Sequence, residues 1–373
     1  MNILQLRSDF GDCGPGTQPL EIAKRLRSRG HTVVFASSGG AMVSEIEAQG
    51  FRHVTIASLA VRARDPVSTL RNVRALASVM RANDIQAVHG HNAASTLCAL
   101  AAARLTGRFD ARVFQSVRGL ETRGTHRWRN WIYRANYARY FAVAQFTKNW
   151  LLELGVREDN IVVTYNGVDL GRFDPKAAHP DIRKELGIPK DALVLAHVGA
   201  FSGWKGQDVL VRAIEALLPK FPKVVALLVG TGDRPFEDAK RIAGELRVAD
   251  RVVFAGYRRD IPAIQAAADV YCQPSTQGEM FPNAILEAMA MGNPWVGSDL
   301  SGLGELTDGG QAGLVSSPGD LDALVANLTR VLADSDLRLR MGRAARAFVE
   351  REFSIDRVVD RIEGAYTDSR RRP

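Results

Sequence analysis

Short apolar runs alternate with longer amphipathic stretches along the first half of the chain. The amphipathic stretches, in which apolar residues recur at helical spacing, include residues 17–29, 66–81 and 93–104. The apolar runs, each of strand length, lie at residues 3–6, 32–36, 54–56, 87–89, 113–117, 140–143 and 161–164. Regular alternation of this kind predicts an α/β fold in which helices cover both faces of a parallel sheet.

The same alternation starts again in the second half. A turn at residues 166–169 and a polar, proline-bearing connection at residues 172–191 precede it. The apolar runs resume at residues 193–198, 224–229, 252–255, 270–272 and 295–297, with helical stretches between them. The pattern therefore predicts two similar Rossmann-like units joined near residues 170–190. The 373 residues are enough for each unit to bury its own core.

Two glutamates flank the start of one helix in the second half. An apolar run at residues 269–274 is followed by a loop that contains Glu279, and the sequence becomes helical from about Asn283, a good capping residue. Glu287 comes eight residues after Glu279. Ligands bind open α/β sheets beyond the carboxyl ends of the strands. Glu287 could there accept hydrogen bonds from a ribose diol, and Glu279 from a second hydroxylated group. Solvated glutamates that favour the helix dipole are the alternative.

Composition is that of an ordinary soluble globular chain, with 46% hydrophobic and 24% charged residues. No run of about 18 apolar residues occurs, and the start of the chain is typical of a strand and not of a signal peptide. Cys13, Cys98 and Cys272 are odd in number and lack metal-ligand spacing. These features predict a protein of the reducing cytoplasm.

Charge is unevenly distributed. Residues 1–165 hold 22 Lys and Arg against 12 Asp and Glu, whereas the remaining residues hold 27 against 29. The basic half should therefore face nucleic acid, phospholipid or a phosphorylated acceptor. Within it, residues 118–139 interleave arginines with Trp128 and Trp131. Such a segment could lie on an anionic membrane or bind nucleic acid; a helix with core aromatics and solvated arginines is the alternative.

The loop and helix around the two glutamates carry a family signature. The matching residues are Glu279, Phe281, Pro282, Asn283 and Glu287, followed by Ala288 and Met289. The string resembles the donor-site signature of retaining family-4 glycosyltransferases (glycosyl transferases group 1), with Met280 where the family often has glycine. The resemblance implies the GT-B fold, two Rossmann-like domains with parallel sheets that face each other across a cleft.

The resemblance also implies the domain roles. Residues 1–170 would form the acceptor-binding domain, joined by the C-terminal helix of residues 355–373. Residues 171–354 would form the domain that binds the nucleotide-sugar donor.

The resemblance also implies which residues would bind phosphate groups. Gly16 matches the glycine that lies beside the phosphates, although a plain turn explains it as well. Gly199 and Lys205 match a second motif in which Lys205 would stabilise the leaving diphosphate, but Ala200 replaces the arginine of that motif. Arg118 stands where the family usually has a histidine. We expect Arg118 to offset the missing arginine; a surface arginine is the alternative reading.

The remaining candidates have weaker signals. Tyr257 and Arg258 follow a strand at the point where the family holds the nucleotide base. His89 and His91 close the strand at residues 87–89 and are candidates for the acceptor side, as are Trp128 and Trp131. The pair Asp334 and Asp336 has metal-ligand spacing but precedes a helix, where a cap is the expected role. Neither a metal nor a cofactor is expected beyond the nucleotide sugar itself.

The resemblance, together with these features, implies a retaining, metal-independent glycosyltransferase that moves a sugar from a UDP- or GDP-linked donor. Glu279, Lys205 and Arg118 would be its catalytic residues. The acceptor would be a glycan or a lipid-linked molecule of the cell envelope, reached from the cytoplasm at the inner face of the membrane. A sugar-nucleotide epimerase of the same fold and a catalytically silent module for phosphorylated sugars are the alternatives. A nucleic-acid binder is not expected, because no recognition motif accompanies the basic residues.

Overall fold

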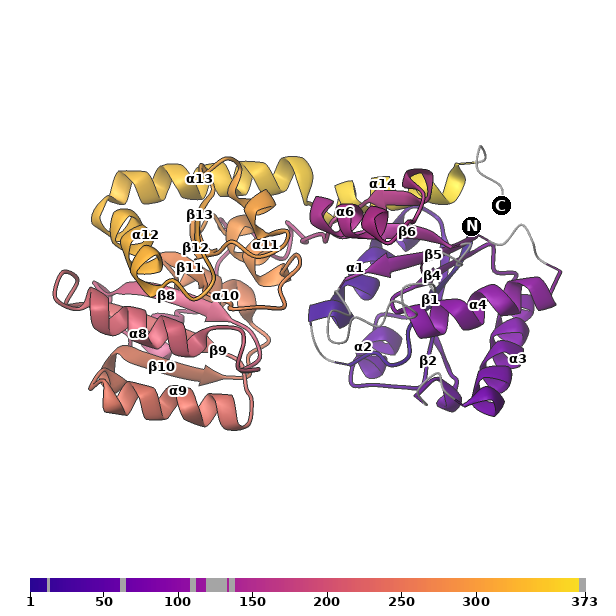
Figure 1. Ribbon diagram of the computed structural model, residues 1–373, viewed down its shortest axis with the longest axis horizontal. Coiled ribbons are helices and arrows are strands. Elements are labelled where there is room, and N and C mark those ends of the chain that lie inside the picture. Colours follow the sequence, from indigo (N-terminus) through magenta and orange to yellow (C-terminus); the bar gives the residue numbers. More distant parts are fainter. Residues whose placement is uncertain (12–13, 61–64, 108–111, 119–132, 134–137, 369–373) are drawn as a thin grey trace. The chain divides into compact units, whose positions relative to one another are not determined.

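The chain divides into two units. The computed structural model describes residues 1–373 except 12–13, 61–64, 108–111, 119–132, 134–137 and 369–373 (Figure 1). Unit 1 comprises Met1–Gly167 together with Ile355–Pro373, and unit 2 comprises Val168–Ser354. The sequence-based boundary at residues 170/171 lies close to this division.

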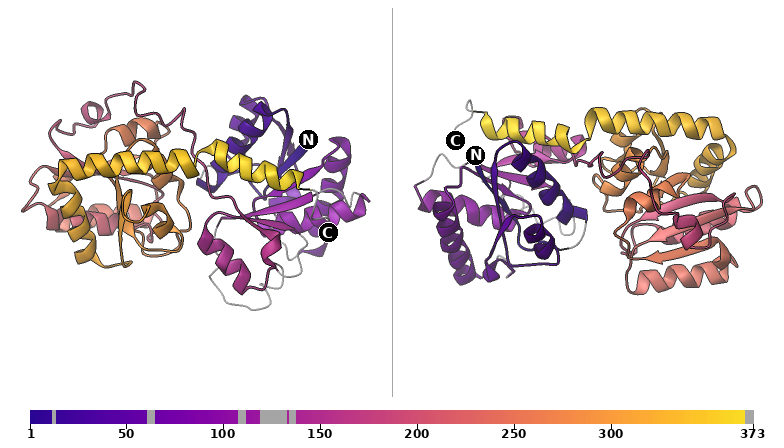
Figure 2. Two further views of the ribbon diagram at one scale, coloured as in Figure 1. Left: turned by 90° about the horizontal axis from the view of Figure 1, so that it is seen from above. Right: turned by 180° about the vertical axis from the view of Figure 1, so that it is seen from behind.

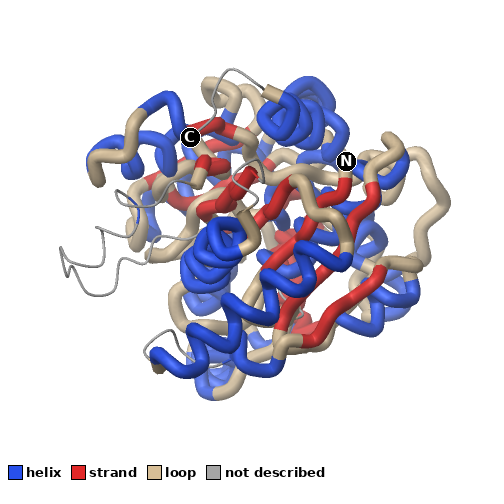
Figure 3. The backbone as a smooth tube through the Cα atoms, turned by 90° about the vertical axis from the view of Figure 1, so that its right-hand side faces the viewer, coloured by secondary structure: helices blue, strands red, loops and turns tan. Residues whose placement is uncertain are grey.

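Unit 1 is built on a parallel sheet. Seven strands in the described part of the chain are arranged in the order β3-β2-β1-β4-β5-β6-β7, and every neighbouring pair is parallel. The strands are β1 (Asn2–Leu6), β2 (Thr32–Ser37), β3 (Arg52–Thr55), β4 (Ala87–Gly90), β5 (Arg112–Val117), β6 (Arg139–Ala142) and β7 (Ile161–Val163). Figure 3 shows these strands side by side with helices on both sides. The order reverses at β1, which makes this a doubly wound sheet.

Alternate residues of each strand enter different layers of the core in unit 1. Ile3 packs with helices on one face, whereas its neighbour Leu4 packs with helices on the other. The first face is covered by α1 (Gly14–Ser28), α2 (Val43–Ala48) and α14 (Ile355–Thr367), the second by α3 (Pro66–Ala82) and α4 (Ala93–Leu105). Helix α6 (Gln145–Glu153) packs near β6 and β7. Because both faces are buried, the strands are mainly apolar, as the sequence pattern predicted, although buried polar residues such as Gln5, His89 and Gln115 interrupt them.

The last helix belongs to unit 1. After Ser354 the chain returns to this unit as α14, drawn in yellow in Figure 2, which packs against α1. Its apolar side is fully buried, and Tyr366 contacts the rings of Phe114 and Phe141. The predicted helix at the end of the chain is therefore an integral part of the first core.

Unit 2 repeats the architecture with a second parallel sheet. Within the described residues its strand order is β10-β9-β8-β11-β12-β13. The strands are β8 (Leu193–Val198), β9 (Val224–Val229), β10 (Val252–Gly256), β11 (Val270–Gln273), β12 (Trp295–Ser298) and β13 (Gly313–Ser316). The helices are α7 (Ile182–Glu185), α8 (Gln207–Leu217), α9 (Arg234–Glu245), α10 (Ile261–Ala266), α11 (Asn283–Ala290), α12 (Leu321–Ala333) and α13 (Ser335–Glu352). Helices α8, α9 and α12 share one core layer, and α7 and α10 share the other.

Helix α11 begins at Asn283 as the sequence predicted, but Asn283 is not its capping residue. Asn283 is the first residue of α11, and Pro282 occupies the capping position without a side-chain cap. Lys205 precedes α8, which is capped by Gly206. In contrast, Asp334 caps α13 as expected, because its carboxylate accepts a hydrogen bond from the backbone N–H of Leu337. The predicted fold class, α/β with two parallel sheets, is confirmed.

Candidate functional site

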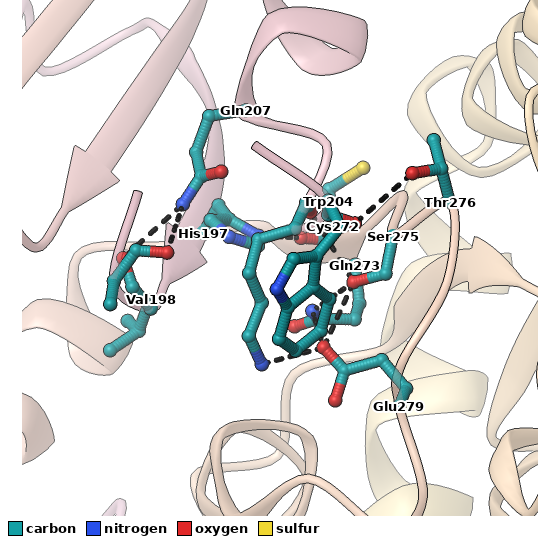
Figure 4. A network of polar contacts seen from close by, with 12 residues as sticks. His197, Val198, Trp204, Gln207, Cys272, Gln273, Ser275, Thr276 and Glu279 are labelled. Carbon is teal, nitrogen blue, oxygen red and sulfur yellow. Dashed lines mark hydrogen bonds and ion pairs between the residues drawn. The ribbon is translucent and has the colours of Figure 1, made fainter. Parts of the chain in front are cut away.

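A hydrogen-bonded carboxylate lies in the loop between β11 and α11. Oε1 of Glu279 accepts a hydrogen bond from Nζ of Lys205 at 2.6 Å. The same oxygen accepts from Nε2 of Gln273 and from Oγ of Ser275, both at 2.9 Å (Figure 4). The Glu279 side chain is only 5% exposed. Three donors on one oxygen hold the carboxylate in place, and no described residue donates to its Oε2.

A left-handed glycine brings Lys205 to this carboxylate. Gly206 has φ 80°, and a Cβ at this position would lie 2.0 Å from the carbonyl oxygen of Pro274. Only glycine therefore allows the start of α8 to approach the end of β11 so closely. The stem of Lys205 passes Gly199, and its Nζ lies 4.7 Å from the centroid of the Trp204 ring. The structure thus requires glycine at position 206, whereas a Cβ at Gly199 would make only ordinary contacts.

Gln273 is the residue that sequence reasoning missed. It is fully buried at the end of β11, and its Oε1 accepts a hydrogen bond from the hydroxyl of Tyr271 at 2.7 Å. This contact orients the amide, so its Nε2 donates to Glu279 and to Ser275. A polar glutamine and serine at the end of an otherwise apolar strand are the signal that could have revealed them.

Glu287 lies on α11 and is electrostatically unusual. Burial raises the pKa of Glu287 to about 7, although the charge of Arg172 acts in the opposite direction. The side chain keeps some exposure to solvent. A carboxyl group with such a pKa changes its charge near neutral pH, and a ligand that donates hydrogen bonds to it would favour the ionised form.

The residues between the two glutamates can offer a ligand mainly their backbone groups. The side chains of Met280 and Phe281 are buried, and the ring of Phe281 packs edge-on against Phe353 at 5.3 Å. Pro282 lacks an N–H and leads into α11, whose first residue is Asn283. In this loop the side chains of Met280 and Phe281 anchor the chain, so any contact they make to a ligand is through the main chain.

Tyr257 and Arg258 follow β10 and differ from each other. Tyr257 is 53% exposed, so its ring can be reached by a ligand. The guanidinium of Arg258 is bound to Glu185 at 2.5 Å and to Asp260 at 2.5 Å, and these hydrogen bonds raise its pKa further. Contact of a nucleotide base with this guanidinium would require breaking those ion pairs.

The histidines of unit 1 correct an expectation. His89 lies within β4 and is fully buried, and its two ring nitrogens contact Oγ of Ser116 at 2.7 Å and the hydroxyl of Tyr366 at 2.8 Å. It is therefore a core residue and not an accessible cleft residue. His91 stacks on it at 4.3 Å and is 7% exposed. Burial lowers the pKa of both well below the ordinary value, so both are neutral.

Arg118 follows β5, is half-buried and has no carboxylate partner in the described part of the chain. It donates a hydrogen bond to Oδ1 of Asn166. Burial and the neighbouring charge of Arg7 lower the pKa of Arg118 to about 9.

The remaining candidates of unit 1 are only partly described. Gly16 lies in the first turn of α1. Trp128 and Trp131 lie outside the described residues.

Two further features concern metals and membranes. No group of three or more metal-ligating His, Cys, Asp or Glu side chains occurs among the described residues. Helices in this part of the chain include none that is both long and apolar enough to cross a membrane.

Two family models match the chain. A family model described as Glycosyl transferases group 1 matches residues 179–348, which lie in unit 2. A second, described as Glycosyltransferase Family 4, matches residues 14–172. Together the two models span most of both units. The chain belongs to the group 1 glycosyltransferases. The family inferred from the loop between β11 and α11 is therefore confirmed, and retention of configuration stays a prediction.

Several relatives of this glycosyltransferase match over most of their length. The N-acetyl-alpha-D-glucosaminyl L-malate synthase of Bacillus anthracis is 26% identical, over 95% of this chain and 94% of its own. The UDP-Gal:alpha-D-GlcNAc-diphosphoundecaprenol alpha-1,3-galactosyltransferase of Escherichia coli is 26% identical over 81% of each chain. The Anabaena protein Alr3699/HepE, solved in complex with UDP, superimposes with a TM-score of 0.85 at 22% identity, covering 98% of this chain and 99% of its own. The glycosyltransferase thus has the GT-B fold, and the roles of its individual site residues stay predictions.

Proposed function

We propose that this glycosyltransferase uses a UDP- or GDP-linked sugar as donor, retains the configuration at the anomeric carbon and needs no metal ion. The observation that carries the proposal is the Lys205–Glu279 pair, held by Gln273 and Ser275 at the carboxyl end of β11. Ligands of open α/β sheets bind at such strand ends. The UDP complex of the Anabaena protein with the same fold supports a nucleoside diphosphate as the ligand.

The proposed roles follow from the charges. Lys205 would stabilise the negative charge that develops on the leaving diphosphate, with help from backbone amides at the start of α11. Glu279 would accept hydrogen bonds from hydroxyls of the donor sugar through Oε2, and Glu287 from the ribose. Tyr257 would contact the base. In unit 1, Gly16 and Arg118 would donate hydrogen bonds to substrate phosphate oxygens.

The proposed reaction proceeds on one face of the sugar. The bond between the anomeric carbon and the diphosphate oxygen breaks, and the acceptor hydroxyl attacks from the same side. The acceptor proton passes to the leaving phosphate oxygen. Glu279 is not the nucleophile in this scheme, because its carboxylate is engaged by three donors and serves to orient the sugar.

The acceptor is proposed to be a glycan or a lipid-linked molecule of the cell envelope. The E. coli relative acts on a sugar linked to diphosphoundecaprenol, which supports a lipid-linked acceptor. The excess of Lys and Arg in residues 1–165 favours an acceptor or membrane surface that carries negative charge.

A panel of nucleotide sugars tests the proposal. UDP or GDP and one of their sugars should raise the Tm of the protein, because ligands that bind the native state stabilise it. Replacing both Lys205→Met and Glu287→Gln should abolish this shift and the turnover. NMR of the product should show the anomeric configuration of the donor. The proposal is wrong if no nucleoside diphosphate binds.

The same panel separates the two alternatives. An epimerase would convert the nucleotide sugar without any acceptor. A silent module would bind a phosphorylated sugar without turnover, a possibility that Ala200 raises because a phosphate-binding arginine is expected there.

A further inference from the structure

Three basic or polar side chains meet at one edge of the sheet in unit 1. Arg7 is the first residue after β1, His91 the first after β4, and Arg118 the first after β5. The three strands are neighbours in the order β1-β4-β5 and run parallel. The three residues therefore emerge side by side at the carboxyl ends of adjacent strands, where α/β folds bind ligands.

These groups affect one another electrostatically. The charge of Arg7 contributes to lowering the pKa of Arg118, and the charges of Arg118 and Arg7 both contribute to lowering that of His91, after burial as the main cause. Two guanidinium groups thus lie close enough to repel each other. Their neighbour His91 is neutral and brings no negative charge to offset them.

No described residue brings a counter-charge to this arrangement. Within the described residues neither Arg7 nor Arg118 forms an ion pair, and the hydrogen-bond acceptor of Arg118 is the neutral amide of Asn166. Nη1 of Arg7, Nε of Arg118 and Nδ1 of His91 are all buried and have no hydrogen-bond partner in the part of the chain that the structure describes. His91 itself is more than nine-tenths buried.

Such a cluster is costly unless a ligand completes it. Buried polar atoms almost always have partners, and a buried charge without one is strongly unfavourable. Two guanidinium groups suit the oxygens of a phosphate or carboxylate. With Nε2 of His91 donating to Oε1 of Gln5, its Nδ1 has a lone pair that can accept from a hydroxyl next to the anion.

We propose that Arg7 and Arg118, with His91 beside them, form an anion-binding subsite of unit 1 that holds a phosphate or carboxylate group of a substrate. The inference rests on the proposed function only in calling the ligand a substrate. Arg7 is new in this role, and the anion is held by a pair of arginines and not by Arg118 alone. The group can belong to the donor diphosphate or to the acceptor.

Calorimetric titration of the full chain with inorganic phosphate tests the subsite. Arg7→Met and Arg118→Met should each weaken phosphate binding by about tenfold or more, since a hydrogen bond to a charged group contributes on this scale. The matched control is Arg71→Met, which removes the same charge from an exposed position on α3. Phosphate binding that is equal in all four proteins would overturn the proposal.

A second titration, with UDP at saturation, identifies the source of the anion. If the subsite serves the acceptor, phosphate still binds beside UDP, and the UDP affinity is the same in Arg7→Met. If it serves the donor, UDP displaces phosphate, and Arg7→Met weakens UDP binding in parallel. Either result supports the subsite. Failure of UDP to bind at all would contradict the proposed function and leave the phosphate result standing.

Thermal melts separate binding from a structural role. Removing a half-buried cation that has no counter-charge among the described residues should leave the Tm without phosphate unchanged or higher, and the variants should lose the phosphate-induced rise that the unmodified protein shows. Arg7→Met is the cleaner variant, because the Arg7 side chain makes no hydrogen bond within the described residues, and the backbone N–H of Arg7, which donates to Ala36, is unchanged by the substitution. A lower Tm in both conditions, with phosphate affinity retained, would show that the arginines support the fold and would contradict the subsite.

Discussion

At the scale of single residues, the position of Glu279 depends on neighbours that do not belong to the signature. Lys205 supplies a positive charge beside Glu279. Gln273 and Ser275 orient the Glu279 carboxylate, because both donate hydrogen bonds to its Oε1. The Gln273 amide is in turn oriented by Tyr271. Oε2 of Glu279 is thereby left to face a ligand, so Gln273 and Ser275 act as positioning residues.

Replacing Gln273→Met should lower kcat/KM about tenfold or more while UDP affinity changes less than threefold. The variant keeps the length of the side chain but removes the donor, and a hydrogen bond to a charged group contributes about 1.5–3 kcal/mol. Steady-state kinetics and calorimetry with UDP measure the two quantities.

Thr276→Val is the matched control for this change. Thr276 is the neighbouring loop residue, and its hydroxyl donates to the backbone oxygen of Trp204 and not to Glu279. Equal losses in the control and in Gln273→Met would show that the loop, and not the orientation of Glu279, determines the rate.

At the scale of elements, helix α11 controls the charge of Glu287. The helix packs against β11, β12 and α13, and its buried apolar side chains leave Glu287 little contact with water. The pKa of Glu287 is about 7, compared with an ordinary value of 4.5. Between these two values the folded protein binds more protons than the unfolded chain, so its stability falls as the pH rises through this window.

Glu287→Gln should therefore gain stability relative to the unmodified protein as the pH increases from 4.5 to above 7. The gain should be on the order of 1–3 kcal/mol, since one pKa unit corresponds to about 1.4 kcal/mol. Thermal melts across this range measure it. The exposed Glu215 on α8 supplies the control, because Glu215→Gln should show no such trend. A constant difference between Glu287→Gln and the unmodified protein would contradict the raised pKa.

The raised pKa of Glu287 also predicts that the protein releases a proton when a nucleotide binds near pH 7. A ribose diol that donates to Glu287 favours its ionised form, so binding of UDP should displace a proton from it. Calorimetry in buffers of different ionisation enthalpy detects this proton. Protons that UDP itself releases are the same for the unmodified protein and for Glu287→Gln. Any proton release that is lost in Glu287→Gln therefore comes from Glu287. Equal release in both proteins would exclude contact between the ribose and this side chain.

The elements also show what the sequence could and could not predict. The strands and the start of α11 were predictable because apolar periodicity depends on local residues. His89 was misjudged because its hydroxyl partner, Tyr366, lies 277 residues further along the chain. Which strands become neighbours likewise determines the raised pKa of Glu287 and the proximity of Arg7 to Arg118. Spacing along the chain does not contain that information.

At the scale of the whole molecule, each unit has its own core, but only unit 2 is continuous in sequence. The first core needs α14, whose side chains Ile355, Val358, Val359, Ile362 and Tyr366 are essentially inaccessible to solvent. Burying one large apolar side chain contributes about 1.5–3 kcal/mol, so five contribute on the order of 10 kcal/mol. That is comparable with the whole free energy of unfolding of a typical domain.

A fragment of residues 168–354 should fold alone, whereas a fragment of residues 1–167 should not. The first keeps its complete core, and UDP should raise its Tm because Lys205, Glu279 and Glu287 all belong to it. The second loses α14 and exposes apolar side chains that this helix contacts, including Phe114 of β5 and Phe141 of β6. Joining residues 355–373 to it through a flexible linker should restore folding, since Arg29 and His31 again find their partner Glu363. Near-UV circular dichroism and thermal melts distinguish these cases. Cooperative unfolding of residues 1–167 alone would show that α14 is an accessory to the first core and not a part of it.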